Sequence, residues 1–285
     1  MSVRPIRQIT QSQPTLEGAG VKLRRAFGFR NPEQFDPFLM LDDFRNDSPA
    51  DFAAGFPWHP HRGIETITYV LAGDVQHQDS LGNSGVISAG DIQWMTSGRG
   101  ILHQEMPRGD SLGRVHGFQL WANLPASLKM SEPRYQDVAS QDVPVLTDDD
   151  GVSARILCGR FWGRRGPVEG IAADPVFLDI TLPPGAEKRL PVETDRNAFA
   201  YVFSGAASFR DSSAPNFEAT NHSLIHFDRG DEVVARSGPE GARFLLVSGR
   251  PFAEPIAWAG PIVMNTQDEL RQAFSELQNG TFLRA

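Results

Sequence analysis

The sequence predicts an all-β protein with few helices, built from two copies of one structural unit. Glycine and proline are plentiful, at 27 and 21 of the 285 residues, and they separate short apolar runs. This spacing is typical of short strands joined by turns. One strand pattern occurs twice along the chain, and only the C-terminal region has the pattern of an amphipathic helix. We therefore expect two β-barrels and one terminal helix.

The repeated pattern is a strand that ends at a turn glycine, found at residues 64–73 and again at 197–205. The alignment matches Tyr69 with Tyr201, Val70 with Val202 and Gly73 with Gly205. Further on, a Gly-Asp pair precedes an extended run in each copy, at 90–91 and at 230–231. A long-period repeat of this kind usually marks a duplicated structural unit.

The repeat divides the chain into two expected domains, residues 1–135 and 136–285. Between the copies, residues 130–151 are polar and include Asp148-Asp149-Asp150, which favours a solvated connector. A calcium loop is the alternative interpretation of those aspartates, but the spaced glutamate and flanking helices of such a loop are missing from the pattern.

A C-terminal helix is predicted over residues 266–279. Thr266 is a candidate N-cap with Glu269 three residues later, and Gly280 provides a stop. One apolar stripe would pack on the outside of a barrel; it comprises Leu270, Ala273, Phe274 and Leu277.

Composition excludes several classes of protein. The formal net charge is −8 with no basic block, so we expect no direct binding of nucleic acid. No apolar stretch is long enough to span a bilayer, and residues 1–13 lack the pattern of a secretion signal. Cys158 is the single cysteine, which excludes an intrachain disulfide and agrees with a cytoplasmic location.

Two triplets carry the most informative chemistry, His59-Pro60-His61 and His103-Gln104-Glu105. In a strand, side chains at i and i+2 leave the same face, so each triplet can aim two ligands at one point. Two such strands facing each other would make a site of three imidazoles and one carboxylate. This set suits Fe(II), Mn, Co, Ni or Cu, and it lacks the thiolates of a structural zinc site.

The second copy lacks these ligands. In our alignment His59 and His61 fall opposite Pro191 and Glu193, while His103 and Glu105 fall near Arg243 and Leu245. The shared architecture is therefore expected to fold without the histidines, which favours a functional role for them over a structural one.

Several long segments resemble the pirin family of the cupin superfamily across nearly the whole chain. The segments are residues 35–44, 55–73, 90–107, 116–121 and 260–266, and they include His59-Pro60-His61-Arg62-Gly63 and Gly98-Arg99-Gly100-Ile101-Leu102-His103-Gln104-Glu105. The resemblance implies a bicupin, with two jelly-roll-like barrels. It also implies one divalent metal in the N-terminal barrel, usually iron, held by His59, His61, His103 and Glu105.

The resemblance bears on neighbouring residues as well. In many other cupins the glutamate of the first motif is a ligand, whereas in pirins the second motif provides it, so Glu65 is expected to support the site rather than bind metal. Trp58 departs from the smaller or polar residue expected beside the first ligand, and would reshape the pocket rim. His77 and His116 are candidates to orient a ligand, with ordinary strand histidines as the alternative. Gln119 could line the barrel and Arg99 could contact substrate or close the rim.

Several pirins resemble quercetin 2,3-dioxygenases in activity, which implies a flavonol-like substrate, O2 and release of carbon monoxide. Glu105 would help remove the 3-hydroxyl proton, and would have to loosen from the metal because a bound carboxylate is a weaker base.

The alternative is a metal-binding regulatory protein, a co-regulator with a protein partner and no physiological flavonol turnover. A third class is a metal-dependent isomerase or hydrolase. A pocket large enough for a flavonol would favour the enzyme. Pirins are often monomers, and we expect a monomer here.

Overall fold

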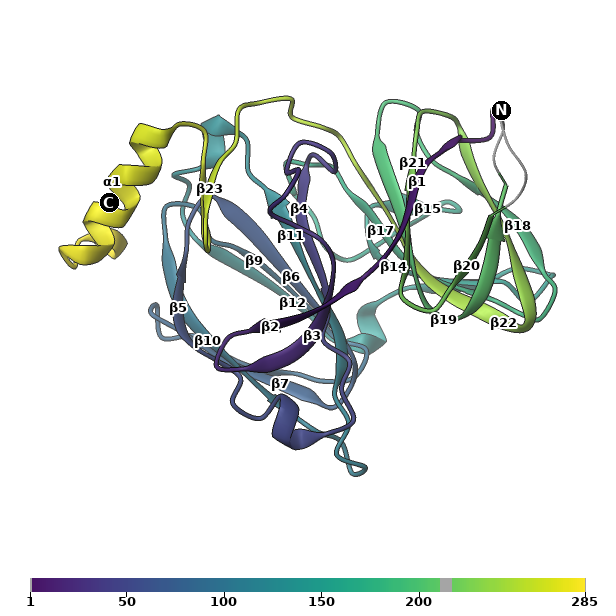
Figure 1. Cartoon of the computed structure of the whole chain (residues 1–285), viewed down its shortest axis with the longest axis horizontal. Coiled ribbons are helices and arrows are strands. Elements are labelled where there is room, and N and C mark those ends of the chain that lie inside the picture. Colours follow the sequence, from purple (N-terminus) through teal and green to yellow (C-terminus); the bar gives the residue numbers. More distant parts are fainter. Residues whose placement is uncertain (1, 211–216, 285) are drawn as a thin grey trace. The chain divides into compact units, whose positions relative to one another are not determined.

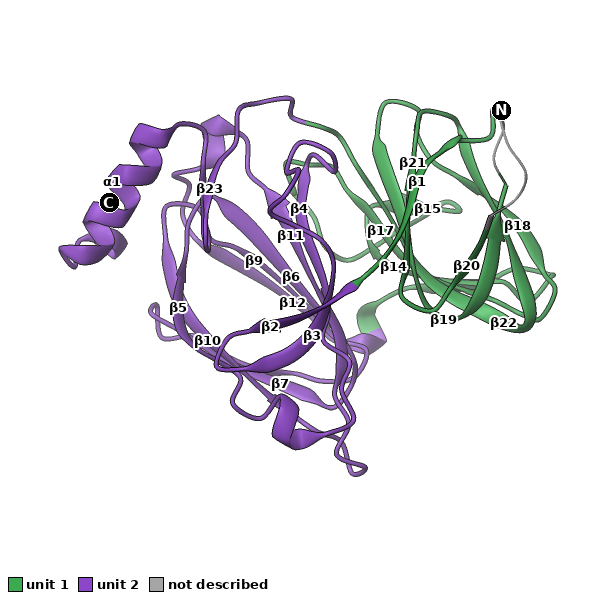
Figure 2. Ribbon diagram, in the orientation of Figure 1, with its two compact units in different colours: residues 1–12, 142–251 green, residues 13–141, 252–285 purple. Residues whose placement is uncertain are grey.

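The structure is a computed structural model that describes residues 2–210 and 217–284, and most of these residues lie in strands (Figure 1). The chain forms two compact units, coloured separately in Figure 2. The first barrel comprises Gln13–Gln141 and Phe252–Ala285, and the second barrel comprises Met1–Ser12 and Asp142–Pro251. Each unit therefore contains two separate stretches of chain. The continuous domains 1–135 and 136–285 differ from the units at both chain ends, and their limits stay a prediction.

The first barrel is built from two sheets whose inner side chains meet. One sheet has the strand order β12 (Arg134–Val138), β9 (Ile92–Thr96), β6 (Ile64–Ala72), β11 (His116–Asn123), β4 (Phe38–Asp43), β3 (Val21–Phe27) and β2 (Gln13–Glu17). The other has the order β5 (Phe56–His61), β10 (Ile101–Arg108), β7 (Asp74–Asp79) and β8 (Ser84–Ile87). Side-chain hydrogen bonds from Thr68 and Gln119 to Glu105 link the two sheets.

The C-terminal segment completes the first barrel with the hairpin of β23 (Ala257–Ala259) and β24 (Ile262–Met264), followed by helix α1 (Gln267–Gln278). Thr266 and Glu269 form a capping box at the start of α1, which confirms the predicted N-terminus. Leu270 and Ala273 are buried against the hairpin, so the predicted apolar stripe packs on the outside of the barrel. Among the described residues, no helix is long and apolar enough to cross a membrane.

The second barrel contains a nine-stranded sheet and a short hairpin. The sheet follows the order β1 (Ile6–Gln11), β21 (Ser223–Phe227), β19 (Asn197–Phe209), β22 (Glu232–Gly249), β17 (Val176–Leu182), β14 (Ser153–Cys158) and β13 (Val145–Thr147), with β18 (Glu187–Pro191) on β22 and β20 (Phe217–Thr220) on β19. The hairpin joins β15 (Arg160–Phe161) to β16 (Arg164–Arg165). Short 3-10 turns occupy Pro49–Asp51, Ala126–Leu128, Ser140–Asp142 and Phe282–Arg284.

Strand pairing confirms one half of the sequence alignment and corrects the other. β6 and β19 hold equivalent central positions, and Gly73 and Gly205 both adopt positive φ. Gly73 separates β6 from β7, whereas Gly205 lies at an irregularity within the continuous strand β19. However, the long strand β22 corresponds to both β10 and β11. Its first part pairs with β18, as β10 pairs with β5, and its last part pairs with β19 and β17, as β11 pairs with β6 and β4.

Consequently, the counterparts of His103 and Glu105 lie in the first part of β22 rather than near Arg243. Ala235 lies opposite Phe209 in the β19–β22 ladder, as Glu105 lies opposite His77 in the β7–β10 ladder, and the sequence alignment matches His77 with Phe209. The counterpart of Glu105 is therefore Ala235, and that of His103 is Val233. The prediction erred because a single continuous strand in the second copy replaces two strands in the first, which sequence spacing does not reveal.

The interior of the second barrel is filled by apolar side chains. Phe209 packs with ring centroids 5.8 Å from Phe227 and 5.5 Å from Phe244, and all three side chains are buried. Among the described residues, no group of metal-ligating side chains gathers in this barrel. Its role is therefore consistent with that of a packed structural unit.

We expect Phe209→Ala to lower the free energy of unfolding by about 3–5 kcal/mol, because the truncation leaves a cavity in a closely packed interior. Urea denaturation measures this change. Val145→Ala is the matched control, since Val145 is 50% exposed and its truncation should cost no more than about 0.5 kcal/mol. Equal losses in the two variants would contradict the assignment of Phe209 to a tightly packed core.

Candidate metal centre

Antiparallel pairing of β5 with β10 places the two ligand triplets side by side. His103 lies directly opposite His59, and a register shift follows between His103 and Glu105. β5 is an edge strand, which explains how Pro60 is accommodated without a backbone donor. Alternation then directs His59 and His61 to one face of β5, as predicted.

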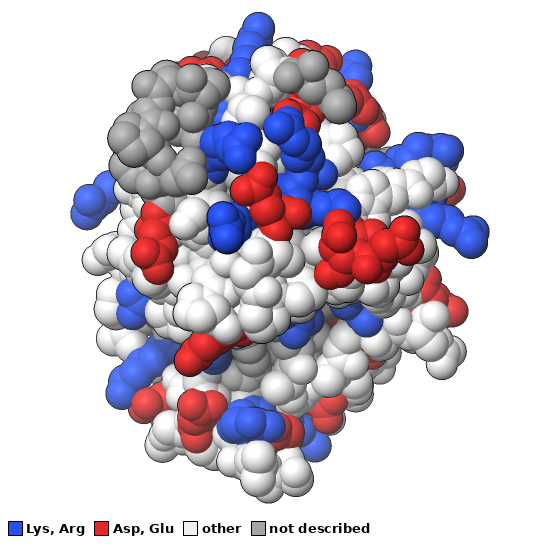
Figure 3. Space-filling model, turned by 90° about the vertical axis from the view of Figure 1, so that its right-hand side faces the viewer, with Lys and Arg blue, Asp and Glu red and all other residues white. Residues whose placement is uncertain are grey.

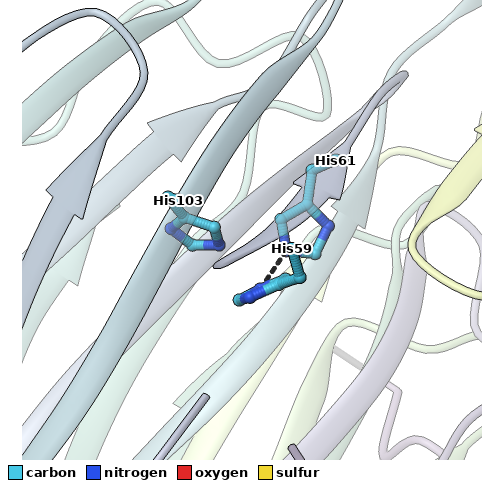
Figure 4. Close-up of side chains that lie close together, drawn as sticks. All are labelled: His59, His61 and His103. Carbon is cyan, nitrogen blue, oxygen red and sulfur yellow. Dashed lines mark hydrogen bonds between the residues drawn. The ribbon is translucent and has the colours of Figure 1, made fainter. Parts of the chain in front are cut away.

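The three histidines form one compact group (Figure 4). One ligand nitrogen of each ring, from His59, His61 and His103, lies within 4.8 Å of the others. The ring centroid of His103 is 4.4 Å from that of His59 and 4.9 Å from that of His61. Three imidazoles in this arrangement are able to hold a metal ion.

Backbone contacts determine which nitrogen of His59 and His61 carries the proton. His59 Nδ1 lies 2.8 Å from the Pro57 carbonyl, and His61 Nδ1 lies 3.2 Å from the Pro261 carbonyl. A carbonyl only accepts, so each Nδ1 must donate and each neutral ring keeps a lone pair on Nε2. The two Nε2 atoms are 3.1 Å apart (Figure 4). Two lone pairs at this separation repel each other, and a bound cation would relieve that repulsion.

His103 is the third ring of the group. It is buried, and neither ring nitrogen has a hydrogen-bond partner among the described residues. Burial, with the nearby histidines, lowers the pKa of both His61 and His103 well below the usual value, so both rings are neutral at physiological pH. An orphaned buried imidazole is costly in a purely structural role. The donor set therefore fits a divalent transition metal.

Glu105 lies on the same strand but outside the group of three. Its buried carboxylate accepts hydrogen bonds from Thr68 Oγ1 at 3.2 Å and from Gln119 Nε2 at 3.1 and 3.2 Å. These donors hold the carboxylate beside the histidines without placing an oxygen within the 4.8 Å group. The role of Glu105 as fourth ligand stays a prediction.

The orientation of Gln119 is fixed in turn by Trp121. The indole Nε1–H of Trp121 donates to Gln119 Oε1 at 3.1 Å, and because indole is only a donor, the amide NH2 must face Glu105. The Trp121 ring also stands edge-on to His61, with centroids 5.1 Å apart. One chain of contacts therefore runs from His61 through Trp121 and Gln119 to Glu105.

A cavity of about 490 Å³ opens on this group, a volume within the range of small-molecule sites. His59, His61, Glu105 and Gln119 belong to its wall. Apolar side chains provide much of the remainder, including Val21, Leu23, Phe29, Met40, Phe44, Phe52, Phe56, Trp58, Val75, Val115 and Trp121. Trp58 is 51% exposed, which agrees with its predicted place at the rim.

Other candidate residues lie away from the three histidines. Glu65 is on the opposite face of β6 from Thr68 and accepts from Thr96 Oγ1 at 2.8 Å. His77 contacts Gln93, with His77 Nε2 and Gln93 Nε2 2.8 Å apart. His116 Nε2 lies 3.8 Å from Asp43 Oδ1, and Arg99 pairs with Glu132 at 2.9 Å. None of these four belongs to the metal-binding group of the described residues.

The C-terminal segment holds the first ligand strand from outside, which sequence reasoning missed. The buried guanidinium of Arg62, next to His61, donates to Glu276 at 2.6 Å and to the Phe282 carbonyl at 2.8 Å, and it lies 4.2 Å from the Phe282 ring centroid. Gly63 is required here, because a Cβ would lie 2.0 Å from the Val263 carbonyl. Its φ of +78° also favours glycine.

The counterpart positions in the second barrel carry apolar residues. Val233 and Ala235 are buried in the core of that barrel, where the first barrel has His103 and Glu105. The histidine group is thus confined to the first barrel among the residues that the structure describes.

Figure 3 shows the charged side chains on one face of the molecule, and the absence of direct nucleic-acid binding stays a prediction. On the face drawn in Figure 3, acidic and basic side chains are interspersed, and no broad basic field is visible. A binding surface that neutralises many phosphates would need such a field.

We expect Arg62→Lys to weaken binding of a divalent metal by about 10- to 100-fold, because the support that orients His61 is lost. Isothermal titration of the metal-free protein with Ni(II) or Co(II) measures the affinity. Arg114→Lys is the matched control, since Arg114 is 48% exposed and pairs only locally with Asp110. Equal affinities in both variants would show that the Arg62 contacts do not support the ligand strand.

Glu65 provides a pH-dependent prediction. Burial raises its pKa from about 4.5 to about 7, so between these values the folded protein binds more protons than the unfolded chain. Stability should therefore fall as pH rises from about 4.5 to 7. We expect Glu65→Gln to remove this loss, to be about 1–3 kcal/mol more stable at pH 8, and to keep its metal.

Urea denaturation at pH 5 and pH 8 and metal analysis test this outcome for Glu65→Gln. The exposed substitution Glu132→Gln should change neither quantity. Loss of bound metal in Glu65→Gln alone would mean that Glu65 is a ligand.

Comparison with known proteins agrees with this geometry. Residues 20–122 match the Pirin family, and residues 177–283 match the Pirin C-terminal cupin domain. A pirin-like protein of Caulobacter vibrioides is 45% identical, covering 99% of this chain and 100% of the relative. A pirin-like protein of Solanum lycopersicum is 43% identical, covering 93% and 88%.

Among solved structures, a quercetin 2,3-dioxygenase from Acinetobacter baumannii is similar with a TM-score of 0.89 and 30% identity, covering 99% of both chains. The sequence matches and the fold thus agree on two cupin domains. The chain belongs to the pirin family.

Proposed function

We propose that the first barrel is a metal-dependent dioxygenase centre of the quercetin 2,3-dioxygenase type, which cleaves a flavonol with O2 and releases carbon monoxide. The observation that carries this proposal is the group of three imidazoles, of which His59 and His61 line a largely apolar cavity. The name of the Acinetobacter baumannii structure, which aligns over nearly the whole chain, supports the same reaction class.

We propose His59, His61, His103 and Glu105 as the ligands and Fe(II) as the metal, with Mn, Ni, Co and Cu as alternatives. Three neutral nitrogens and one carboxylate form a mixed donor set that these metals share. When bound, the metal supplies net positive charge and open coordination positions for an anionic oxygen donor and O2.

Glu105 is proposed as the base that takes the proton of the flavonol 3-hydroxyl. The substrate O–H bond breaks, the proton passes to a carboxylate oxygen of Glu105, and the electron pair stays on the substrate oxygen. Gln119 Nε2 and Thr68 Oγ1 keep the carboxylate oriented before transfer. A positioned carboxylate of this kind typically contributes about 10²–10⁴-fold to rate.

The cavity wall supports the choice of a planar aromatic substrate. Phe29, Phe56 and Trp58 provide flat apolar surface in the cavity wall, and such surfaces favour stacked or edge-on aromatic contacts. The apolar lining also excludes water from the deprotonated substrate, which strengthens its interaction with positive charge.

Anaerobic reconstitution with each candidate metal, followed by quercetin and O2, tests this proposal. We expect flavonol absorbance to fall and carbon monoxide to appear only with bound metal. His103→Ala should lose metal, and Glu105→Gln should lower kcat by about 10²-fold or more while quercetin still binds. Glu132→Gln should behave as wild type, because Glu132 is 78% exposed.

Chelation separates catalysis from folding in the same experiment. We expect the metal-free protein to lose turnover and to keep its far-ultraviolet circular dichroism. If the protein turns over no flavonol with any of the bound metals, the flavonol assignment is wrong. That result would favour the alternative, a metal-binding regulatory protein that acts through a protein partner. A cytoplasmic location and a monomeric state stay predictions.

A further inference from the structure

A second polar group lies in the wall of the cavity, apart from the histidines. Arg25 on β3 donates from Nε to Asp42 Oδ1 at 2.8 Å and from Nη2 to Asp42 Oδ2 at 2.7 Å. Arg25 Nη2 also lies 2.8 Å from Glu17 Oε1 on β2. All three residues line the cavity, so charged groups face the space that a ligand would occupy.

Strand pairing fixes the place of this group relative to Glu105. Asp42 is the cross-strand partner of Gln119, whose amide holds Glu105, and Arg25 is the cross-strand partner of Asp42. Neighbouring strands lie about 4.8 Å apart, so Arg25 is about 10 Å across the sheet from Gln119. The cavity therefore has polar groups at two separate places along its wall.

The surroundings of the second group are charged and only partly open to solvent. Asp42 is 4% exposed, the side chain of Arg25 is 15% exposed, and Phe29 lies with its ring centroid 5.3 Å from the Arg25 guanidinium. An ion pair withdrawn from water in this way costs desolvation energy, and stability alone is a weak reason to have one. A role in ligand recognition would account for its place in the cavity wall.

We propose that Arg25, Asp42 and Glu17 form a subsite that accepts a hydrogen bond from a phenolic hydroxyl at the end of the substrate remote from the metal. The ligand class is a planar aromatic molecule with chelating oxygens at one end and a neutral hydroxyl donor at the other. This inference rests on the proposed function, since it assumes that the chelating end lies at the histidines.

Charge and hydrogen-bond capacity select a hydroxyl over other groups. One guanidinium and two carboxylates sum to a charge of −1, so a carboxylate or phosphate on the ligand would be repelled. Carboxylate oxygens each have two acceptor positions, and Asp42 and Glu17 therefore retain capacity beyond their bonds to Arg25. An apolar group at this place would desolvate these charges without replacing their bonds to water.

Binding measurements with the full-length, metal-loaded protein without oxygen test the subsite independently of turnover. The probes are 3-hydroxyflavone, which has no remote hydroxyl, together with 3,4′-dihydroxyflavone and 3,7-dihydroxyflavone. Quenching of tryptophan fluorescence gives Kd for each. In the wild type we expect at least one dihydroxyflavone to bind about tenfold or more tightly than 3-hydroxyflavone.

Substitutions then assign the preference to the subsite. Glu17→Gln and Asp42→Asn should each reduce it to about threefold or less while leaving the Kd of 3-hydroxyflavone nearly unchanged. Glu17 has a 39% exposed side chain, so its substitution should not affect folding. Glu132→Gln, outside the cavity, should keep the full preference.

Three results would overturn the inference, and they are distinguishable. Equal Kd values for all three flavonols, or a preference that survives in both variants, would exclude the subsite and leave the proposed function standing. If none of the flavonols binds the metal-loaded protein, that result would contradict both the proposed function and the subsite.

Discussion

The antiparallel register of β5 against β10 is the constraint on which the metal centre depends. It sets His103 opposite His59, and strand alternation then brings His61 to the same face. A shift of one residue in this register would turn the ligands of one strand away from those of the other. The three imidazoles converge because this one pairing is fixed.

Contacts from distant parts of the chain keep that register and the ring orientations in place. The carbonyl of Pro261 accepts a hydrogen bond from the Nδ1–H of His61, and the C-terminal helix and tail bind Arg62. On the cavity side, Trp121 orients Gln119, which in turn holds Glu105. The ligand strand lies at a sheet edge, so these contacts replace the support that a second neighbouring strand would give.

The two barrels show how one architecture serves two purposes. The first keeps a cavity lined by aromatic and polar side chains, whereas the second fills its interior with packed phenylalanines. At the positions equivalent to His103 and Glu105, the second barrel has Val233 and Ala235 in its apolar core. The contrast agrees with a functional rather than structural role for the histidines, because the fold forms without them.

The sequence by itself determined the all-β class, the duplication, the capped C-terminal helix and the two ligand triplets, because each is recognised from spacing along the chain. Alternation in a strand places His59 and His61 on one face whatever the tertiary fold. Only the tertiary structure decided which residues surround that group. Arg25, Asp42 and the Pro261 carbonyl reach the cavity wall through pairings between segments far apart in sequence. Val233 rather than Arg243 is the counterpart of His103, because two strands of the first barrel correspond to one strand of the second. Such long-range pairings depend on the packing of the whole barrel, which no local pattern encodes.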